Sequence, residues 1–394
     1  MAGFTLSVLA LGASVFGAAV PSVAVPSASA AQQVVASQLV ALEQLREFVE
    51  RQSERFAGLS TRGSDQVTIH VVSDRSAAAA ADLPELQRLA SAAGIKVAVE
   101  HEKYSLLELN RIQDSIPTKG PFAAEDAGLS RWGVNPDTNT VDVGVLEVTP
   151  ELLAQAEEAY GDKVVVTRQP RPRYGTAQPD TQQALASGRR TDTPPYYGGD
   201  MIDVVGHMIC SSGFTLTNLY GTRYAITAGH CGALNARVET NDRSYFGTMY
   251  FHRLGNGNLD NALVGGVSYG GRIWVGGPAA TSHLPVHSAR DSCNGCLVNF
   301  DGSFTGEAVG RLLGEPFCAT FEGGDYSCGL QRATSVTGAQ LCQNGDSGGP
   351  IFAHDGQGGV IAVGIFTGYY ATWDCVYTRL PPILNSWQST ITTG

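Results

Sequence analysis

The stretch Asn344-Gly345-Asp346-Ser347-Gly348-Gly349-Pro350 decides how this 394-residue chain is interpreted. It is a glycine-rich turn directly before the apolar run 351–353. Glycines allow the backbone to bend sharply. The N–H groups of Gly345 and Ser347 are therefore predicted to converge on one point, where they would stabilise a developing oxyanion. Ser347 becomes a candidate nucleophile, but a serine hydroxyl needs a base to take its proton.

Two other segments supply the missing groups. Thr227-Ala228-Gly229-His230-Cys231 follows an apolar run, and Asn258-Leu259-Asp260-Asn261-Ala262-Leu263-Val264 puts an acid before another. A neutral imidazole can accept the proton of Ser347 and return it to a leaving amine. A buried carboxylate holds that imidazole in the required tautomer. His230, Asp260 and Ser347 are therefore the predicted catalytic triad.

These three segments, in this order, resemble the signature of the chymotrypsin-like serine peptidases, in the bacterial branch of alpha-lytic protease and the streptogrisins. The resemblance covers about residues 198–394. It implies an all-β catalytic domain of two six-stranded β-barrels with a C-terminal helix and the triad in the cleft between the barrels. It also implies a preceding α+β pro-region that assists folding and inhibits the enzyme until it is removed. The expected function is a secreted serine endopeptidase that forms an acyl-enzyme on Ser347.

One departure from the family concerns Asp346. In the family this acid forms a buried ion pair, in bacterial members with an arginine of a short turn. The corresponding turn, residues 299–303, contains no arginine. Arg290 and the mature N-terminus are the two substitutes that we expect.

The resemblance also locates the substrate pocket. Gln340 and Leu341 would form its base, and Thr367, Gly368 and Tyr369 would form its wall and the edge that pairs with substrate. No acid stands at the base, so cleavage after Arg or Lys is not expected, and an apolar side chain is. Glycine is usual where Tyr369 falls. Either Tyr369 partly fills the pocket or the alignment shifts by one residue.

All eight cysteines lie between Cys210 and Cys375, which favours disulfides and an oxidising compartment over free thiols. A metal site is disfavoured because only one C-x-x-C pair is present. The resemblance implies two disulfides, and the other four cysteines allow three pairings. The expected pairs are Cys210–Cys231 and Cys342–Cys375, with Cys318–Cys328 and Cys293–Cys296 favoured for the remainder.

Composition agrees with a globular, glycine-rich protein. The chain is 43% hydrophobic, which excludes a mainly disordered protein, and its 47 glycines favour short strands with tight turns. The formal net charge of −11 disfavours binding to nucleic acid.

The N-terminal residues resemble a signal peptide. Residues 4–20 are apolar or small, and Ala28-Ser29-Ala30 fits a cleavage site. Residues 1–30 are thus predicted to be a signal peptide, too short for a membrane span, on a secreted protein.

Residues 31–173 form the predicted pro-region. They contain two strand–helix–strand units, recognised from periodicity and from capping residues. The predicted helices are 34–56, 83–93, 105–116 and 150–160, and the predicted strands are 67–72, 96–100, 140–148 and 163–167.

Residues 174–197 form the predicted processing linker. Prolines and the pair Arg189-Arg190 mark it as exposed and open to proteolysis, in contrast to an uncut interdomain linker. Residues 198–394 form the predicted peptidase domain, with strands at 223–226 and 360–365 and one helix at 381–391.

Two other functions are considered. An esterase or lipase is disfavoured, because no helix follows either G-x-S-x-G serine, Ser268 or Ser347. A binding protein on an inactive protease scaffold is disfavoured because the triad is complete. Asp242 is the nearest competitor of Asp260 as the acid of the triad, but it lacks the apolar run.

No cofactor or metal is expected. The expected partners are protein or peptide substrates and the pro-region itself, with no nucleic acid or membrane, on a monomer.

Overall fold

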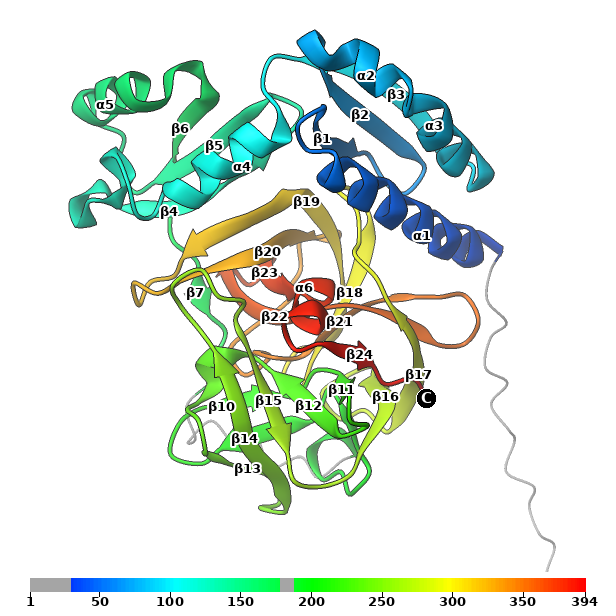
Figure 1. Ribbon diagram of the computed structural model, residues 1–394. Helices are drawn as coiled ribbons and strands as arrows, with labels where there is room; N and C mark the ends of the chain where they lie inside the picture. The colour runs from blue at the N-terminus through cyan, green and yellow to red at the C-terminus, as the bar shows by residue number, and fades with distance from the viewer. Residues whose placement is uncertain (1–29, 178–187) are drawn as a thin grey trace, which may run out of the picture.

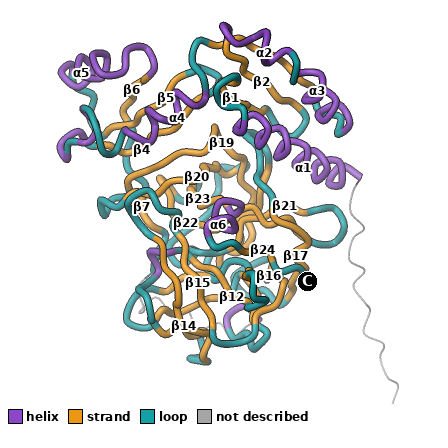
Figure 2. Tube along the Cα trace, viewed as in Figure 1, coloured by secondary structure: helices purple, strands orange, loops and turns teal. Residues whose placement is uncertain are grey.

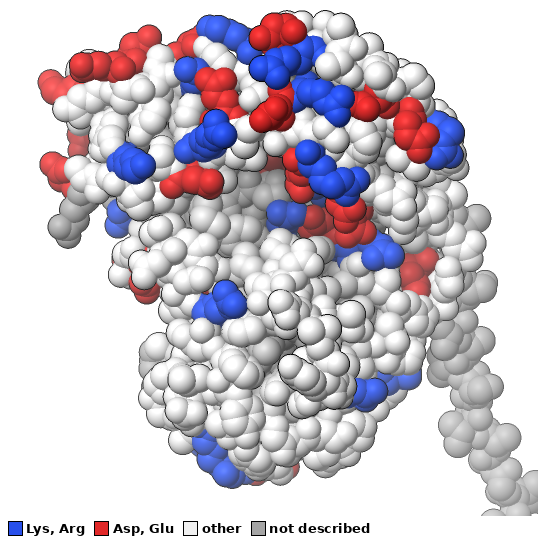
Figure 3. Space-filling model, viewed as in Figure 1, with Lys and Arg blue, Asp and Glu red and all other residues white. Residues whose placement is uncertain are grey.

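The computed structural model describes residues 30–177 and 188–394, which form an N-terminal part (30–177) and a C-terminal part (188–394) (Figure 1). Most of the helix lies in the N-terminal part, while the C-terminal part is built of strands and loops (Figure 2). On the face shown in Figure 3, charged side chains gather over the N-terminal part, and the C-terminal part is mostly uncharged.

The first unit of the N-terminal part is a three-stranded sheet with helices packed on it. β1 pairs antiparallel with β2, and β2 pairs parallel with β3. Its core includes Leu39, Leu42, Leu45 and Val49, the residues whose helical spacing predicts the first helix. The elements are α1 (Ala30–Arg51), β1 (Phe56–Thr61), β2 (Gln66–Val72), α2 (Ser76–Ala80), α3 (Leu83–Ala92), β3 (Lys96–Glu102) and α4 (Leu106–Ser115).

The second unit repeats the order of two strands, a helical segment and a third strand. It comprises β4 (Leu129–Asn135), β5 (Thr140–Val145), α5 (Pro150–Tyr160), β6 (Val164–Arg168) and the short β7 (Arg173–Tyr174). Ser105 caps α4 by accepting from the Glu108 N–H, and Thr149 caps α5 by accepting from the Leu152 N–H. These caps begin the two helices where the sequence predicts them.

The described strands of the C-terminal part form two sheets. One has eight strands and the other, which includes β4–β6 of the N-terminal part, has 13. The strands are β8 (Tyr196–Gly198), β9 (Met201–Val204), β10 (Ile209–Ser211), β11 (Thr215–Asn218), β12 (Arg223–Thr227), β13 (Arg237–Thr240), β14 (Tyr245–Arg253), β15 (Asn261–Gly265), β16 (Tyr269–Val275), β17 (Ser282–Ala289), β18 (Leu297–Gly302), β19 (Gly306–Thr320), β20 (Tyr326–Ser335), β21 (Pro350–His354), β22 (Val360–Ala371), β23 (Asp374–Arg379) and β24 (Ser389–Ile391), with one helix, α6 (Leu380–Ser386). The eight-stranded sheet runs β10-β9-β13-β14-β15-β12-β11-β24.

The N-terminal part extends the larger sheet. β4 pairs with β19 at Cys318↔Trp132, so the second unit continues the β19–β20 hairpin across the boundary. The first unit shares its core with Cys293, Cys296 and Ile361 of the C-terminal part. Within the described residues, none of the helices has the length and apolar character that a membrane span needs.

Two predicted helices are too long. The first ends at Arg51, and Phe56 instead opens β1, where its ring packs edge-on against Phe48 with centroids 6.1 Å apart. The last ends at Ser386, because Gln388 takes a left-handed φ of 47° and residues 389–391 then pair with β11. The first error arises because apolar spacing continues past the helix into the buried strand β1.

Candidate active site

The histidine turn lies at the end of β12. A short 3-10 turn, Gly229–Cys231, holds His230, and the disulfide between Cys231 and Cys210 fixes the turn to β10. A Cβ on Gly229 would collide with the Arg253 carbonyl oxygen and lie 3.0 Å from Asp260 Oδ1. Only glycine therefore allows the histidine turn to approach the acid so closely.

His230, Asp260 and Ser347 come together as a hydrogen-bonded chain. Asp260 Oδ2 lies 2.6 Å from His230 Nδ1, and Asp260 Oδ1 accepts from the His230 backbone N–H at 3.0 Å. His230 Nε2 lies 2.7 Å from Ser347 Oγ. Asp260 and Ser347 are fully buried. The carboxylate thus fixes both the backbone and the ring of the histidine, and the second ring nitrogen can accept the serine proton.

The serine turn precedes β21 and depends on two glycines. Gly345 and Gly348 adopt φ values of 96° and 84°, a conformation that side chains disfavour. A Cβ on Gly348 would collide with Thr227 Oγ1, since this turn packs against the histidine strand. The Gly345 N–H donates to the Gly175 carbonyl oxygen at 2.6 Å.

Asp346 is held by neutral donors. It accepts from the N–H groups of Phe304 at 2.9 Å and Thr305 at 3.0 Å, from the Gln343 N–H at 2.9 Å and from the Thr305 hydroxyl. Burial raises the pKa of Asp346, and these hydrogen bonds oppose the shift. The expectation that Arg290 pairs with Asp346 is wrong, because Arg290 lies 3.3 Å from Glu43 of α1.

The turn formed by residues 299–303 contains no arginine, but Arg189 and Arg190 contact it from an earlier part of the sequence. Arg189 Nη2 lies 2.8 Å from Asp301 Oδ1, and its Nη1 donates to the Gly302 carbonyl oxygen at 3.1 Å. Arg190 donates to the Ser303 carbonyl oxygen at 3.1 Å. Burial raises the pKa of Asp301 to about 7, although Arg189 opposes this shift.

The predicted exposure of Arg189 and Arg190 is therefore wrong. Both are fully buried, and Tyr196 is 2% exposed. Proline and arginine content indicated an exposed linker, but the guanidinium groups are buried against residues 301–303, whose carbonyl and carboxylate oxygens accept from Nη1 and Nη2 of Arg189 and from Nη2 of Arg190.

The residues predicted for the pocket wall lie on β22, and those predicted for its base lie before Cys342. The wall residues are Thr367, Gly368 and Tyr369, in the part of β22 that pairs with β7. Tyr369 Oη donates to Asn344 Oδ1 at 2.8 Å. Leu341 is fully buried in a core cluster with Tyr369, and Gln340 is exposed.

Sequence reasoning missed two aromatic residues beside the triad. The Tyr174 ring stacks on His230 with centroids 4.1 Å apart, and on its other side it stacks on Phe321 at 4.2 Å. Tyr174 and Phe321 stand in no motif, so nothing local in the sequence marks them.

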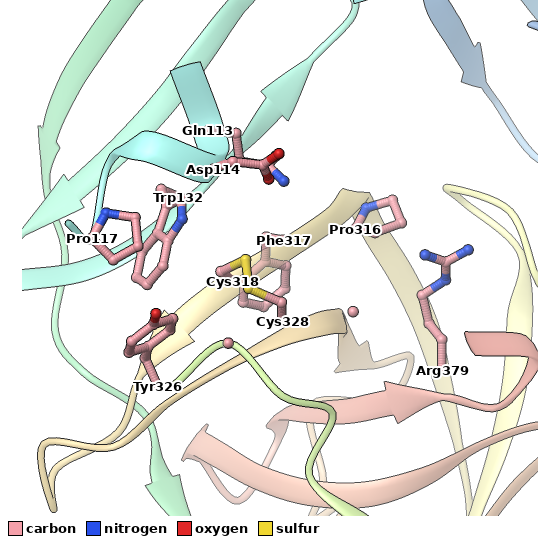
Figure 4. Close-up of a pocket in the computed structure, with 12 residues that line it drawn as sticks. Gln113, Asp114, Pro117, Trp132, Pro316, Phe317, Cys318, Tyr326, Cys328 and Arg379 are labelled. Atoms are coloured by element: carbon pink, nitrogen blue, oxygen red, sulfur yellow. A yellow bond between two sulfur atoms is a disulfide. The ribbon is translucent and has the colours of Figure 1, made fainter. Parts of the chain in front are cut away.

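The four disulfides of the structure are the pairs that the sequence analysis favours: Cys210–Cys231, Cys293–Cys296, Cys318–Cys328 and Cys342–Cys375. Cys318–Cys328 borders a cavity of about 370 Å³ between the β19–β20 hairpin and Trp132 of the N-terminal part (Figure 4). No triad residue lines this cavity.

Among the described residues, one group has the geometry of metal ligands: His70, Glu100 and Glu102 of the N-terminal part. The two ring nitrogens of His70 lie 3.0 Å from Glu102 Oε1 and 3.0 Å from Ser60 Oγ. Protein groups thus satisfy this imidazole.

Comparison with known proteins connects this geometry to a family. The chain is 32% identical over 179 residues to Serine protease 2 of Streptomyces fradiae, a match that spans 43% of this chain and 92% of that protein. A glutamic-acid-specific serine protease of solved structure, described as using a histidine triad in substrate binding, is 24% identical with a TM-score of 0.42, over 50% of this chain and 100% of that one. A Nocardiopsis protease is also 24% identical with a TM-score of 0.42, over 50% and 98%. No protein-family model matches the chain.

The family follows from the sequence match, which includes nearly the whole length of Serine protease 2. The chain therefore belongs to the bacterial chymotrypsin-like serine proteases and is a serine endopeptidase.

Proposed function

We propose that this endopeptidase is secreted as a precursor and that Ser347, His230 and Asp260 carry its chemistry. Ser347 attacks the peptide carbonyl, His230 takes and returns the proton, and Asp260 orients the imidazole. The N–H groups of Gly345 and Ser347 stabilise the oxyanion. The observation that carries this proposal is the chain of short hydrogen bonds from Asp260 through His230 to Ser347.

The organisation that we propose is a signal peptide at 1–30, a pro-region at 31–173, a processing linker at 174–197 and a monomeric peptidase domain at 198–394. Within this domain we propose two six-stranded barrels. Continuity of β4 with β19 supports a pro-region that assists folding, because the second unit of the N-terminal part completes a sheet edge that would otherwise be open. The Gly175 carbonyl oxygen accepts from the Gly345 N–H and so occupies the site proposed for the oxyanion, which supports an inhibitory role for the N-terminal part.

A fluorophosphonate probe tests the active enzyme against an inactive scaffold. We expect the processed protein to hydrolyse an unfolded protein substrate and to carry the probe on Ser347, and Ser347→Ala to lose both properties. Processed protein that neither reacts with the probe nor cuts substrate would instead be a binding protein on this scaffold.

A further inference from the structure

A segment of the N-terminal part lies directly beside the triad. On one side, β7 pairs antiparallel with β22 at Gly368↔Tyr174, and the Gly175 N–H donates to the Thr367 carbonyl oxygen at 3.2 Å. On the other side, Ala177 exchanges two backbone hydrogen bonds with Ile209, at 3.2 and 3.0 Å. Backbone pairing therefore holds the segment on both sides of the Gly175–Thr176 bond, in the manner of a bound peptide substrate.

The carbonyl group of Gly175 lies where the triad acts. Its oxygen accepts from the Gly345 N–H at 2.6 Å, so it occupies the site proposed for the oxyanion. A Cβ built on Gly175 would lie 3.2 Å from Ser347 Oγ. The nucleophile, the oxyanion donor and one particular peptide bond thus meet at a single point.

The space around the α-carbon of Gly175 admits only glycine. A Cβ on Gly175 would overlap Phe366 Cε1 and lie 2.9 Å from Cζ. The Phe366 ring is 1% exposed and packs edge-on against Phe300, which limits its movement. Tyr369, joined to Asn344, lies in the same core cluster as Phe366. Gly175 has no left-handed φ, so the requirement comes from space and not from backbone conformation.

The residue before Gly175 meets an aromatic site. Tyr174 lies between the rings of His230 and Phe321 with interplanar angles of 20° and 10°. A Cβ on Gly368 would collide with the Arg173 carbonyl oxygen, so glycine at this position of β22 lets the segment pair closely.

We propose that Gly175–Thr176 is the bond this enzyme cuts in its own chain, and that Phe366 restricts the residue before any cut bond to glycine. The proposal rests on the proposed function, which it deepens. It replaces the expected apolar pocket residue with glycine, preceded by an aromatic residue. Burial of Arg189 and Arg190 agrees with it, because bonds beside that pair are not accessible in the folded chain.

The cut proceeds in two balanced steps. Ser347 Oγ bonds to the Gly175 carbonyl carbon while His230 takes the hydroxyl proton, and the C–N bond to Thr176 breaks as His230 passes that proton to the Thr176 nitrogen. Water then attacks the Gly175–Ser347 ester, His230 transfers the water's proton to Ser347 Oγ, and Gly175 leaves as a carboxylic acid that ionises.

The first test uses the secreted full chain. Early in processing, we expect N-terminal sequencing and intact mass to show a chain that begins at Thr176. Gly175→Val should slow this cleavage about 100-fold, which corresponds to about 2.7 kcal/mol at about 1.4 kcal/mol per tenfold change in rate. Gly277→Val is the matched control, because a Cβ on the exposed Gly277 meets nothing within 4 Å. A first cut elsewhere, or normal processing of Gly175→Val at this bond, would overturn the proposal.

The second test does not depend on folding of the variant chain. Processed wild-type enzyme is given the peptide Pro-Arg-Tyr-Gly-Thr-Ala, which is residues 172–177, and versions with Ala, Val or Leu in place of Gly. We expect kcat/KM to fall roughly 10- to 100-fold for Ala and further for Val and Leu. Enzyme that prefers Leu or Val, and that reacts with the fluorophosphonate probe in a separate sample, would refute the glycine restriction alone. Enzyme that the probe does not label would refute the proposed function.

Discussion

The carboxylate of Asp260 illustrates how much one residue contributes to this site. It accepts both from the backbone N–H of His230 and from the ring nitrogen Nδ1. Rotation of the imidazole would break the second bond inside a fully buried environment. The ring is therefore held with Nε2 toward Ser347.

Replacement of Asp260 by asparagine tests this orientation. The amide keeps the size of the side chain but favours the other tautomer of His230, with the proton on Nε2. We expect kcat for peptide hydrolysis to fall about 10⁴-fold, with little change in KM. Steady-state kinetics at constant pH measure the effect, and an unchanged urea midpoint shows that the fold is intact. A loss below tenfold would contradict the assigned role.

Phe366 allows the glycine restriction to be altered. Phe366→Ala removes the ring that a Cβ before the cut bond would meet. We expect the ratio of kcat/KM for the alanine peptide to that for the glycine peptide to rise at least about tenfold, since about 1.4 kcal/mol of steric cost is relieved. Because the ratio compares two substrates on one enzyme, partial loss of stability does not affect it. An unchanged ratio would exclude Phe366 as the limiting residue.

The residues that could be predicted from sequence are those in local motifs. His230, Asp260, Ser347 and Gly345 each stand in a short segment whose glycines and apolar flanks are visible in the chain. Tyr174 could not be found in this way, because its contacts with His230 and Phe321 exist only after distant segments pack.

At the scale of elements, the β19–β20 hairpin connects the two parts of the chain. Cys318 and Cys328 join its strands, and β4 pairs with its outer edge at Cys318. Helix caps at Ser105 and Thr149 made the starts of α4 and α5 predictable from sequence. The ends of α1 and α6 were not, because α1 is followed by the apolar residues of the buried β1, and α6 is followed by the left-handed Gln388, which apolar spacing does not mark.

Removal of the hairpin disulfide should weaken the fold. In the chain-entropy account, a loop closed over a sequence separation of 10 stabilises by roughly 2–3 kcal/mol. We expect the double variant Cys318→Ser, Cys328→Ser, made in the Ser347→Ala chain, to lose about this much free energy of unfolding in urea. Equal midpoints for the variant and its Ser347→Ala parent would show that the disulfide contributes nothing.

Across the whole molecule, charged groups join the N-terminal part to the C-terminal part. Arg46 of α1 lies 3.4 Å from Asp291 Oδ2, and Arg379 pairs with the same carboxylate. Burial alone would raise the pKa of Asp291, but the attraction and hydrogen bonds of Arg379 and Arg46 lower it below 3.8.

A pH dependence follows from this lowered pKa. The ion pairs of Asp291 contribute fully above its ordinary pKa of 3.8, and their contribution is lost as pH falls through the lower value of the folded chain. In the Ser347→Ala chain, we expect Asp291→Asn to reduce the free energy of unfolding by a constant amount above about pH 5, and the difference to shrink below that. Urea titrations from pH 3 to 7 measure it. A difference that grows toward acid would reverse the sign and contradict the ion-pair account.

In the proposed function one chain is both the enzyme and its first substrate, and the rate of self-processing tests this most directly. Purified precursor is refolded over a hundredfold range of concentration, beside Ser347→Ala, and its cleavage is followed by intact mass. We predict first-order cleavage with a rate constant that does not depend on the precursor concentration, and no cleavage in Ser347→Ala. Cleavage of the Ser347→Ala precursor at the wild-type rate would contradict the account, because another nucleophile would then be cutting the chain.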